Sequence, residues 1–195
     1  MPPKAKFTRS ELIQAALDLV RSKGADALTA RALGQRLGSS ARPIFTVFQS
    51  MDEVWQEVTQ AARELYAGYI QEGLSQDKMP AFKGVGMAYI RFALTEPKLF
   101  HLLFMTEQVP KPGLANVLPA IDDSYPQILS SVQEHYSLDQ AKAKWLYRHL
   151  WIYTHGIAVL CATSLCTFSP GETGQMLTEV CRAMLREIRD VDAGP

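Results

Sequence analysis

Cysteine is scarce in this sequence: three residues among 195, an odd number that does not suit a framework of intramolecular disulfides. No apolar segment follows the polar start MPPKAKFTR, as the core of a secretory signal would, so we expect a cytoplasmic protein. Glycine and proline are not enriched, which argues against fibrous and low-complexity chains. The four histidines and scattered acids show no zinc-ligand spacing, and we expect no cofactor.

One long segment lacks charged side chains. Residues 149–171 contain no Asp, Glu, Lys or Arg and are long enough to span a bilayer. They also hold two histidines, several hydroxyl side chains and a Ser-Pro-Gly end, which favour a helix buried in the protein or in a subunit interface. We therefore expect no membrane contact.

The formal net charge of zero hides an uneven distribution. Residues 1–50 carry eight basic and three acidic side chains, a net charge of +5, so the remainder carries −5. This layout is typical of a nucleic-acid-binding module joined to a second domain.

Helix start and stop signals predict about nine helices and an all-α fold, since no strand-like alternation occurs. A capping box at Thr8–Glu11 begins the first helix, which ends at Gly24. A second capping box at Ser50–Glu53 begins a long helix that continues to about residue 74. Ser40 can cap a short third helix with Pro43 in its first turn. Further helices are expected at about 29–37, 82–95, 138–165 and 170–190. Another is expected to begin at Pro97, and one interrupted by Pro119 and Pro126 is expected to end at about residue 136.

Three residues have the spacing of a helix-turn-helix. Gly34 provides the small residue where the two helices cross, Gly38 tolerates positive φ in the turn, and Ile44 fills the angle between the helices. Val47, one turn beyond Ile44, is expected to face the same core. The alternative is an ordinary helical hairpin without a DNA-binding role.

The outward side of the third helix would read DNA. Arg42 can donate two hydrogen bonds to a guanine edge, and Thr46 or Pro43 can touch a thymine methyl group or a phosphate. Helix amino-termini supply further phosphate donors. The candidate DNA-binding residues are Lys6, Arg9, Thr29, Arg31, Ser40, Ala41, Arg42, Pro43, Phe45, Thr46 and Ser50.

Residues 7–58 resemble the DNA-binding domain of the TetR (tetracycline-repressor) family. The segments that carry the resemblance are LIQAALDLVRSKG, LTARALGQRLGSS and IFTVFQSMDEV, in family order. The resemblance implies a homodimer whose third helices enter successive major grooves of a palindromic operator in double-stranded DNA.

Two positions depart from the family pattern. The family usually has tyrosine at the position of Phe45 and often lysine at that of Met51, and both contact phosphates. Their loss predicts weaker nonspecific affinity and a flatter salt dependence. A basic arm of Lys4, Lys6 and Arg9 can compensate by following the DNA backbone or by entering a minor groove.

The later segments AYIRFALTEPKLFHLLF (88–104) and LWIYTHGIAVL (150–160) resemble the ligand-binding domain of a TetR subgroup with a Trp-His-Gly signature, here Trp151, His155 and Gly156. The resemblance implies a DNA-binding domain at 1–50 and a ligand-binding and dimerisation domain at 51–195. The helix over 50–74 links the two. A small-molecule effector would favour a dimer that no longer matches the operator.

Aromatic and thioether side chains suit a largely apolar effector. The candidate ligand-binding residues are Tyr66, Tyr69, Met87, Phe92, Phe104, Met105, Tyr147, Trp151 and His155. The alternative is that they are ordinary core, with His155 hydrogen-bonded inside the bundle.

The last two helices are expected to pair with those of a second copy as a four-helix bundle. Apolar residues at helical spacing mark the expected dimer interface: Ile157, Leu160, Leu177, Val180, Met184 and Ile188. Cys161, Cys166 and Cys181 favour buried packing over a redox or metal sensor.

The sequence thus predicts a ligand-responsive DNA-binding regulator, a repressor that a small, largely apolar effector releases from a palindromic operator. An enzyme is the first alternative, but Gly84-Val-Gly86 lacks the third glycine of a phosphate loop, and the pair Asp122-Asp123 lacks the partner acid of helical prenyl-transfer enzymes. A helical interaction protein with a degenerate helix-turn-helix is the second, favoured by Phe45 and Met51.

Overall fold

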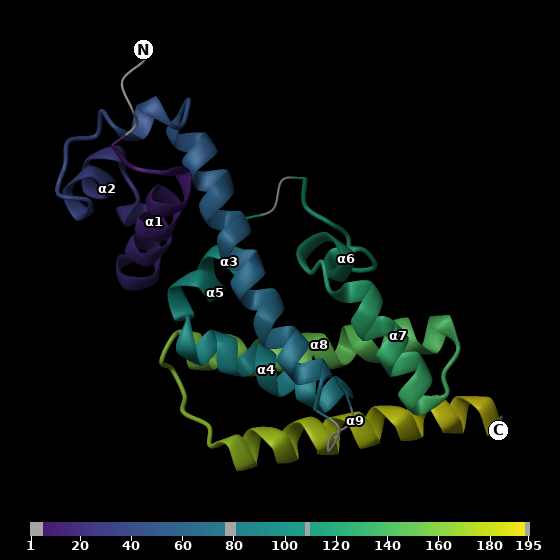
Figure 1. The fold of residues 1–195 in the computed structure, drawn as a ribbon. Helices are drawn as coiled ribbons and strands as arrows, with labels where there is room; N and C mark the ends of the chain where they lie inside the picture. Colours follow the sequence, from purple (N-terminus) through teal and green to yellow (C-terminus); the bar gives the residue numbers. More distant parts are fainter. Residues whose placement is uncertain (1–5, 77–80, 108–109, 194–195) are drawn as a thin grey trace. The chain divides into compact units, whose positions relative to one another are not determined.

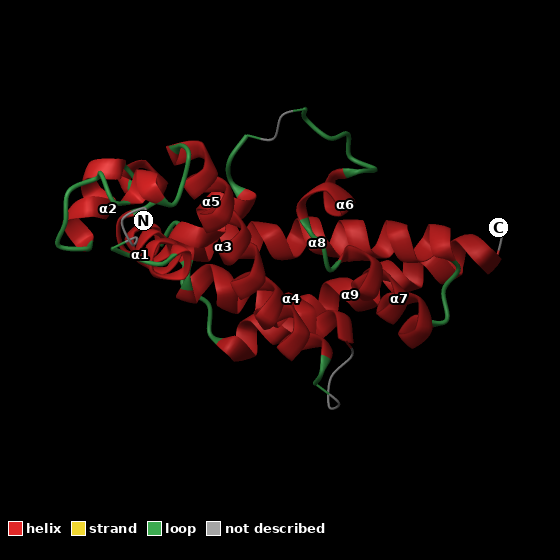
Figure 2. Cartoon of the chain, turned by 45° about the horizontal axis from the view of Figure 1, so that its top comes forward, coloured by secondary structure: helices red, strands yellow, loops and turns green. Residues whose placement is uncertain are grey.

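The computed structural model describes residues 6–76, 81–107 and 110–193, without the side chains of residues 81 and 191–193. Over these residues the chain forms nine α-helices and no strand, which confirms the predicted all-α class (Figures 1 and 2). Within the same segments no helix combines the length and apolar character that crossing a membrane requires. Lys4, expected in the basic arm, lies outside the described residues.

The helices occupy most of the chain between short loops. Their bounds are α1 (Arg9–Lys23), α2 (Ala30–Arg36), α3 (Met51–Leu74), α4 (Ala81–Thr95), α5 (Pro97–Phe104), α6 (Val117–Ile121), α7 (Tyr125–Tyr136), α8 (Gln140–Ala162) and α9 (Pro170–Ala193). Two 3-10 helices, Ala25–Ala27 and Ile44–Thr46, lie between α1 and α2 and between α2 and α3.

The helix count agrees with the prediction through two differences that cancel. The expected third helix after Ser40 is wrong: turns and the 3-10 helix Ile44–Thr46 replace it. Pro43 disfavours helical backbone at Arg42, and the β-branched residues that follow are weak helix formers. The expected helix that ends near residue 136 is in turn divided into α6 and α7, with Pro126 in the first turn of α7.

The capping predictions are largely confirmed. The Thr8 side chain and the Glu11 carboxylate cap each other's backbone N–H groups at the start of α1. At α3 the Ser50 hydroxyl accepts from the Glu53 N–H at 3.2 Å, but the Glu53 carboxylate accepts from the Gln49 N–H at 2.7 Å instead of closing the box. The Ser50 hydroxyl therefore caps α3 as expected, and the bond accepted by the Glu53 carboxylate is shifted by one residue.

The chain divides into two compact units. One holds residues up to Leu65 together with Glu96–Thr106, and the other holds Tyr66–Thr95 and the described residues from Glu107 on. The first unit extends past residue 50 because the first half of α3 adds buried side chains to its core, and it includes α5 because α5 packs on α1. The expected domain boundary after residue 50 stays a prediction. Arg21 of α1 donates through Nε to Glu96 at 2.8 Å, and that carboxylate is 6% exposed.

The first unit has its own apolar core. α1 packs against α2 and α5, and the first half of α3 adds Val54 and Val58, both fully buried. Fully or almost fully buried side chains from each segment meet there: Leu12, Ala16, Val20, Leu33, Ile44, Phe48, Leu99 and Phe100. Removing a large side chain from such a core costs about 2–5 kcal/mol.

In the second unit α7, α8 and α9 all pack against α4. The end of α3 approaches α4 through two glycines. A Cβ atom on Gly84 would lie 2.1 Å from the Gly73 carbonyl oxygen, and one on Gly73 would lie 2.6 Å from the Gly84 oxygen. The two helices therefore touch backbone to backbone, which only glycine permits.

Candidate functional site

The three residues of the predicted helix-turn-helix have the expected roles. Gly38 has φ +62°, Ile44 is fully buried, and a Cβ atom on Gly34 would lie 2.8 Å from the Ser40 carbonyl carbon. The turn thus passes directly over α2. This close approach fixes where the segment after the turn begins.

That segment, Ser40–Thr46, places short and polar side chains outward. Arg42 and Thr46 are exposed, Phe45 is 48% exposed, and Ala41 and Pro43 are half-buried. Arg42 makes no hydrogen bond or ion pair with another described residue, so its guanidinium is available to a partner. Val47 is only half-buried, so its expected core role is filled in part, and Phe48 is the buried aromatic side chain.

The basic candidates differ in how they are engaged. Arg9 pairs with Glu53 at 2.9 Å and with Glu57, and its guanidinium lies 4.5 Å from the centre of the Phe48 ring. The Gln49 N–H, together with Arg9, lowers the pKa of Glu53. In this structure Arg9 therefore connects α1 to α3 rather than extending as part of an arm.

The other polar candidates lie around the same segment. Lys6 donates to the Ser39 hydroxyl at 3.3 Å, and the Thr29 hydroxyl caps α2 by accepting from the Ala32 N–H at 3.1 Å. Arg31 and Ser40 are exposed. Their contact with DNA stays a prediction.

The second unit contains a buried carboxylate among aromatic rings. Asp122, 3% exposed, accepts from the Tyr66 hydroxyl at 2.8 Å and from the Ser124 N–H at 2.9 Å. Burial raises the pKa of Asp122, while these two hydrogen bonds act in the opposite direction. A cavity of about 10 Å³, room for about one water molecule, adjoins the carboxylate; it is lined by Tyr66, Phe82, Val85, Gly86, Tyr89, Asp122, Tyr147, Trp151 and Thr154.

His155 and Trp151 form a stack beside this cluster. Their rings are 4.8 Å apart and 16° from parallel, and His155 Nδ1 lies 2.9 Å from the Tyr89 hydroxyl. Burial lowers the pKa of His155, so the neutral imidazole is favoured at pH 7. The Tyr89 contact agrees with the alternative that His155 is hydrogen-bonded inside the bundle. Its role in ligand binding stays a prediction.

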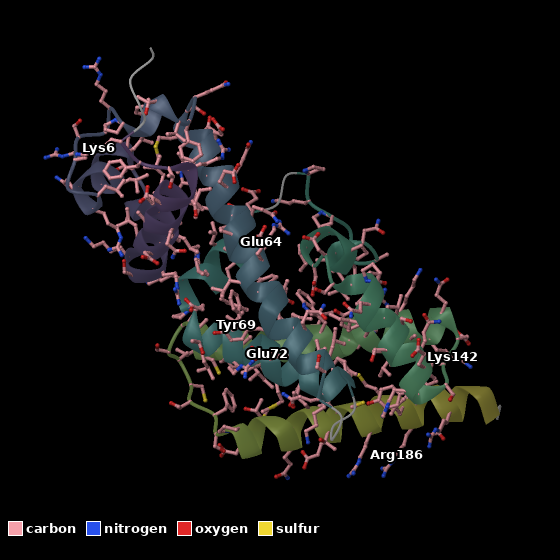
Figure 3. The ribbon with its side chains drawn as sticks, in the orientation of Figure 1. Lys6, Glu64, Tyr69, Glu72, Lys142 and Arg186 are labelled. Atoms are coloured by element: carbon pink, nitrogen blue, oxygen red, sulfur yellow. The ribbon has the colours of Figure 1, made fainter. Side chains whose placement is uncertain are left out.

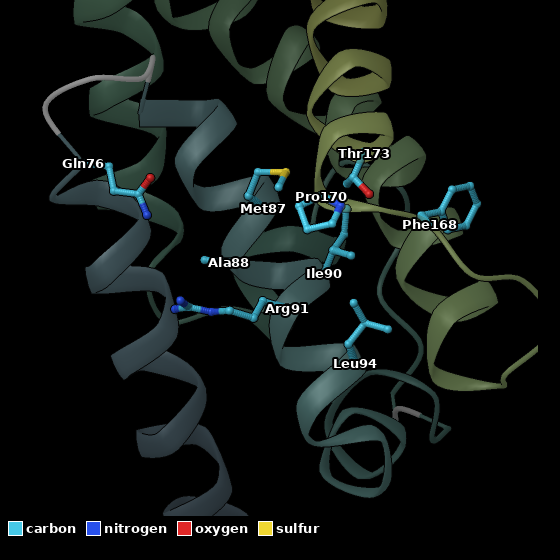
Figure 4. A pocket seen from close by; sticks show the side chains of 9 residues that line it. All are labelled: Gln76, Met87, Ala88, Ile90, Arg91, Leu94, Phe168, Pro170 and Thr173. Atoms are coloured by element: carbon cyan, nitrogen blue, oxygen red, sulfur yellow. The ribbon is translucent and has the colours of Figure 1, made fainter.

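A larger pocket lies on another face of α4. It measures about 290 Å³ and is lined by Gln76, Met87, Ala88, Ile90, Arg91, Leu94, Phe168, Pro170 and Thr173 (Figure 4). Arg91 pairs with Glu72 and lies 5.0 Å from the centre of the Tyr69 ring; Figure 3 labels Tyr69 and Glu72 on the later part of α3. The volume of this pocket, about 290 Å³, is at the lower end of the range for small-molecule sites.

The comparison with known families decides which kind of protein this is. The family model described as "Tetracyclin repressor-like, C-terminal domain" matches residues 82–184, more than half of the chain. The chain belongs to the TetR family of transcriptional regulators.

A solved structure shows the same fold. The chain resembles a protein of Mesorhizobium loti assigned to the TetR family of transcriptional regulators, with a TM-score of 0.52 and 17% identity. The match covers 92% of this chain and 98% of that one. No curated protein matches the sequence.

Not all predicted effector residues of this TetR chain lie together. Tyr66, Tyr147 and Trp151 line the cavity at Asp122, and the buried Phe92 packs edge-on against Tyr66 and Tyr69 with ring centres 5.3 Å apart. Met87 lies in the larger pocket instead. Phe104 and Met105 lie in the first unit, with α5 and the segment after it, and their assignment to the ligand site stays a prediction.

Sequence reasoning missed Asp122 and Tyr89. Asp122 was considered only as half of an acidic pair, and nothing local distinguishes it from the exposed Asp123. Tyr89 lies one turn after Val85 on the face of α4 that lines the cavity, a spacing that could have identified it.

The predicted dimer residues of the TetR chain differ in their burial within a single chain, and their place in a dimer interface stays a prediction. Ile157, Leu177 and Ile188 are buried within a single chain, and Leu177 packs at the position that a Gly86 side chain would occupy. Leu160, Val180 and Met184 are half-buried, and Ile152 on α8 is 46% exposed. Apolar spacing identified the inward face of each helix together with part of the outward one.

Proposed function

We propose that this TetR-family protein is a ligand-responsive repressor that binds a palindromic DNA operator as a homodimer. The observation that carries the proposal is the segment Ser40–Thr46, which is anchored by Gly34 and Ile44 and carries the exposed Arg42, a side chain that pairs with no other described residue. An anchored backbone with short outward side chains suits close approach to base edges.

The second unit would supply the effector response. The pocket at Arg91 and the cavity at Asp122 flank α4, and α4 continues through Glu96 directly into α5, which packs on α1. A small, largely apolar effector that displaces α4 would act on the unit that contains the reading segment. The outward side chains Ile152, Leu160, Val180 and Met184 on α8 and α9 are the surface we assign to dimerisation.

A second candidate function is a helical ligand-binding or interaction protein without DNA affinity. Two observations favour it: the reading segment contains only turns and a 3-10 helix, and Arg9 is engaged with Glu53 and Glu57. A DNA-binding test separates the two functions directly.

The test selects DNA from a random duplex library with the wild-type protein and with Arg42→Ala. Arg186→Ala removes the same charge from an exposed position on α9 and serves as the matched control (Figure 3). We expect a palindromic site for the wild type and the control, and a relaxed preference with about 5- to 150-fold weaker binding for Arg42→Ala, equivalent to about 1–3 kcal/mol.

Two results would count against the proposal. Failure of the wild type to enrich any sequence at low ionic strength would favour the protein without DNA affinity. An unchanged preference in Arg42→Ala would show that another side chain reads the bases.

A further inference from the structure

The Asp122 carboxylate is buried and hydrogen-bonded to neutral groups. It is 97% shielded from solvent, since only 3% of the residue is exposed, and its hydrogen-bond donors are a neutral hydroxyl and a backbone N–H. Among the residues that the structure describes, no lysine, arginine or histidine forms an ion pair with it. A charged carboxylate buried in this setting is unfavourable unless it takes up a proton or a positive charge joins it.

Aromatic rings surround the same carboxylate. Tyr66, Tyr89, Tyr147 and Trp151 line the cavity, while its other walls are apolar except for Thr154. The faces of aromatic rings attract cations, most strongly when water is excluded. A carboxylate among such rings therefore favours an organic cation over a neutral ligand and repels an anion.

Entry to the cavity requires a side-chain movement, because about 10 Å³ does not hold an alkylammonium group. Trp151 lines the cavity and is also partly exposed, so this ring separates the cavity from solvent. Its Nε1 is buried without a hydrogen-bond partner in the described part of the chain, so rotation of the indole breaks its stacking on His155 but no hydrogen bond. Trp151 can therefore move to admit a ligand and then close against it, and a ligand held in this way binds one conformation better than the other, as a switch requires.

We propose that the effector is an organic ammonium compound whose charged group binds Asp122 inside the cage formed by Tyr66, Tyr89, Tyr147 and Trp151. The inference rests on the proposed effector function and specifies its ligand class. The Trp151 ring closes the site in the absence of ligand, and the apolar part of the ligand packs along α4.

The test measures binding to the full-length protein by isothermal titration calorimetry in the absence of DNA. The cationic probes are choline, benzyltrimethylammonium and hexyltrimethylammonium. The matched probes are 3,3-dimethyl-1-butanol, which replaces the choline nitrogen by carbon, and its anionic relative 3,3-dimethylbutanoate. We expect at least one cation to bind and neither matched probe to bind within tenfold of it; no binding by any of the three cations would overturn the inference.

Variants then locate the site. Asp122→Asn keeps the side-chain shape and removes the charge, and Asp123→Asn removes the same charge from the exposed neighbour. We expect the first to weaken cation binding at least tenfold and the second to leave it within twofold. Equal effects of both would indicate a general electrostatic attraction and contradict the assignment.

A second variant guards against misfolding of Asp122→Asn. Trp151→Leu changes a partly exposed position and keeps the carboxylate, so we expect a several-fold loss of cation affinity with a native circular dichroism spectrum. Unchanged affinity would remove Trp151 from the site and refute the cage. Calorimetry uses no DNA, so the two proposals can fail separately. Binding of operator without binding of any cation would refute only this inference, and binding of a cation without binding of DNA would refute only the proposed repressor function.

Discussion

Replacing Gly34 with alanine adds one methyl group where α2 meets the turn. The added carbon would lie 2.8 Å from the Ser40 carbonyl carbon, 3.0 Å from the Ala41 nitrogen and 3.0 Å from the Ser39 oxygen. All three are backbone atoms, so no side-chain rotation relieves the contact. Ordinary contact begins near 3.4 Å, and the turn must therefore move by about 0.6 Å.

The two free-energy terms of this substitution oppose each other. Alanine inside a helix is favoured over glycine by about 0.8–1 kcal/mol, whereas overpacking of this kind costs about 1–3 kcal/mol. We expect Gly34→Ala to lower the free energy of unfolding by up to about 2 kcal/mol. The displaced turn leads directly to Arg42, and binding geometry tolerates shifts of only about 0.5 Å, so DNA affinity should fall at least tenfold.

Gly68→Ala is the matched control. Gly68 lies within α3, and a Cβ atom there would meet nothing within 4 Å. The control should gain about 0.8–1 kcal/mol from helix propensity alone, which corresponds to a rise in Tm of about 2–4 °C. Thermal unfolding gives the stabilities, and fluorescence anisotropy with the selected duplex gives the affinities.

The reasoning would be refuted if Gly34→Ala gained as much stability as Gly68→Ala and bound the duplex as tightly as the wild type. That result would mean that the turn moves freely over α2. It would also remove the backbone contact as the anchor of the reading segment.

Three more predictions concern other parts of the chain. Burial raises the pKa of Asp122, so the charged carboxylate lowers the free energy of unfolding at pH values above that pKa, and this effect is absent below the pKa of the unfolded state. Asp122→Asn should therefore be more stable than the wild type at pH 8. Urea titrations should show the difference disappearing toward about pH 4. Val180→Glu puts a charge on the half-buried outward face of α9 and should shift the protein to monomer in sedimentation velocity, whereas an unchanged dimer would place the interface elsewhere. Phe45→Tyr adds a hydroxyl at a 48% exposed ring and should strengthen duplex binding about 2- to 12-fold, equivalent to about 0.5–1.5 kcal/mol, in anisotropy titrations; no gain would mean that this ring does not face a phosphate.

Local signals in the sequence predicted most helix ends. The capping of α1 by Thr8 and Glu11 and the positive φ at Gly38 depend on interactions between residues that are close along the chain. Such features can therefore be predicted from the order of the residues. The helix-turn-helix spacing was predictable for the same reason. The third helix failed because Pro43 and the β-branched residues after it outweighed the cap at Ser40.

Side chains that meet across the fold were predicted in part. Tyr66, Tyr147 and Trp151 were identified as a group by residue type, but their common partner Asp122 was not. Asp122 and Asp123 are adjacent and chemically identical, and only the course of the chain between α6 and α7 buries one and exposes the other.

The sequence by itself determined the all-α class, the spacing of the turn at Gly38 and the basic character of the first fifty residues, because each depends on neighbours along the chain. Only the tertiary structure decided which apolar side chains face their own core. Leu177 and Val180 lie one turn apart on α9, yet the first is buried against Gly86 and the second remains half-exposed. Apolar periodicity indicates that a face of a helix is shielded from water. The packing of α4 against α9 determines which surface covers that face.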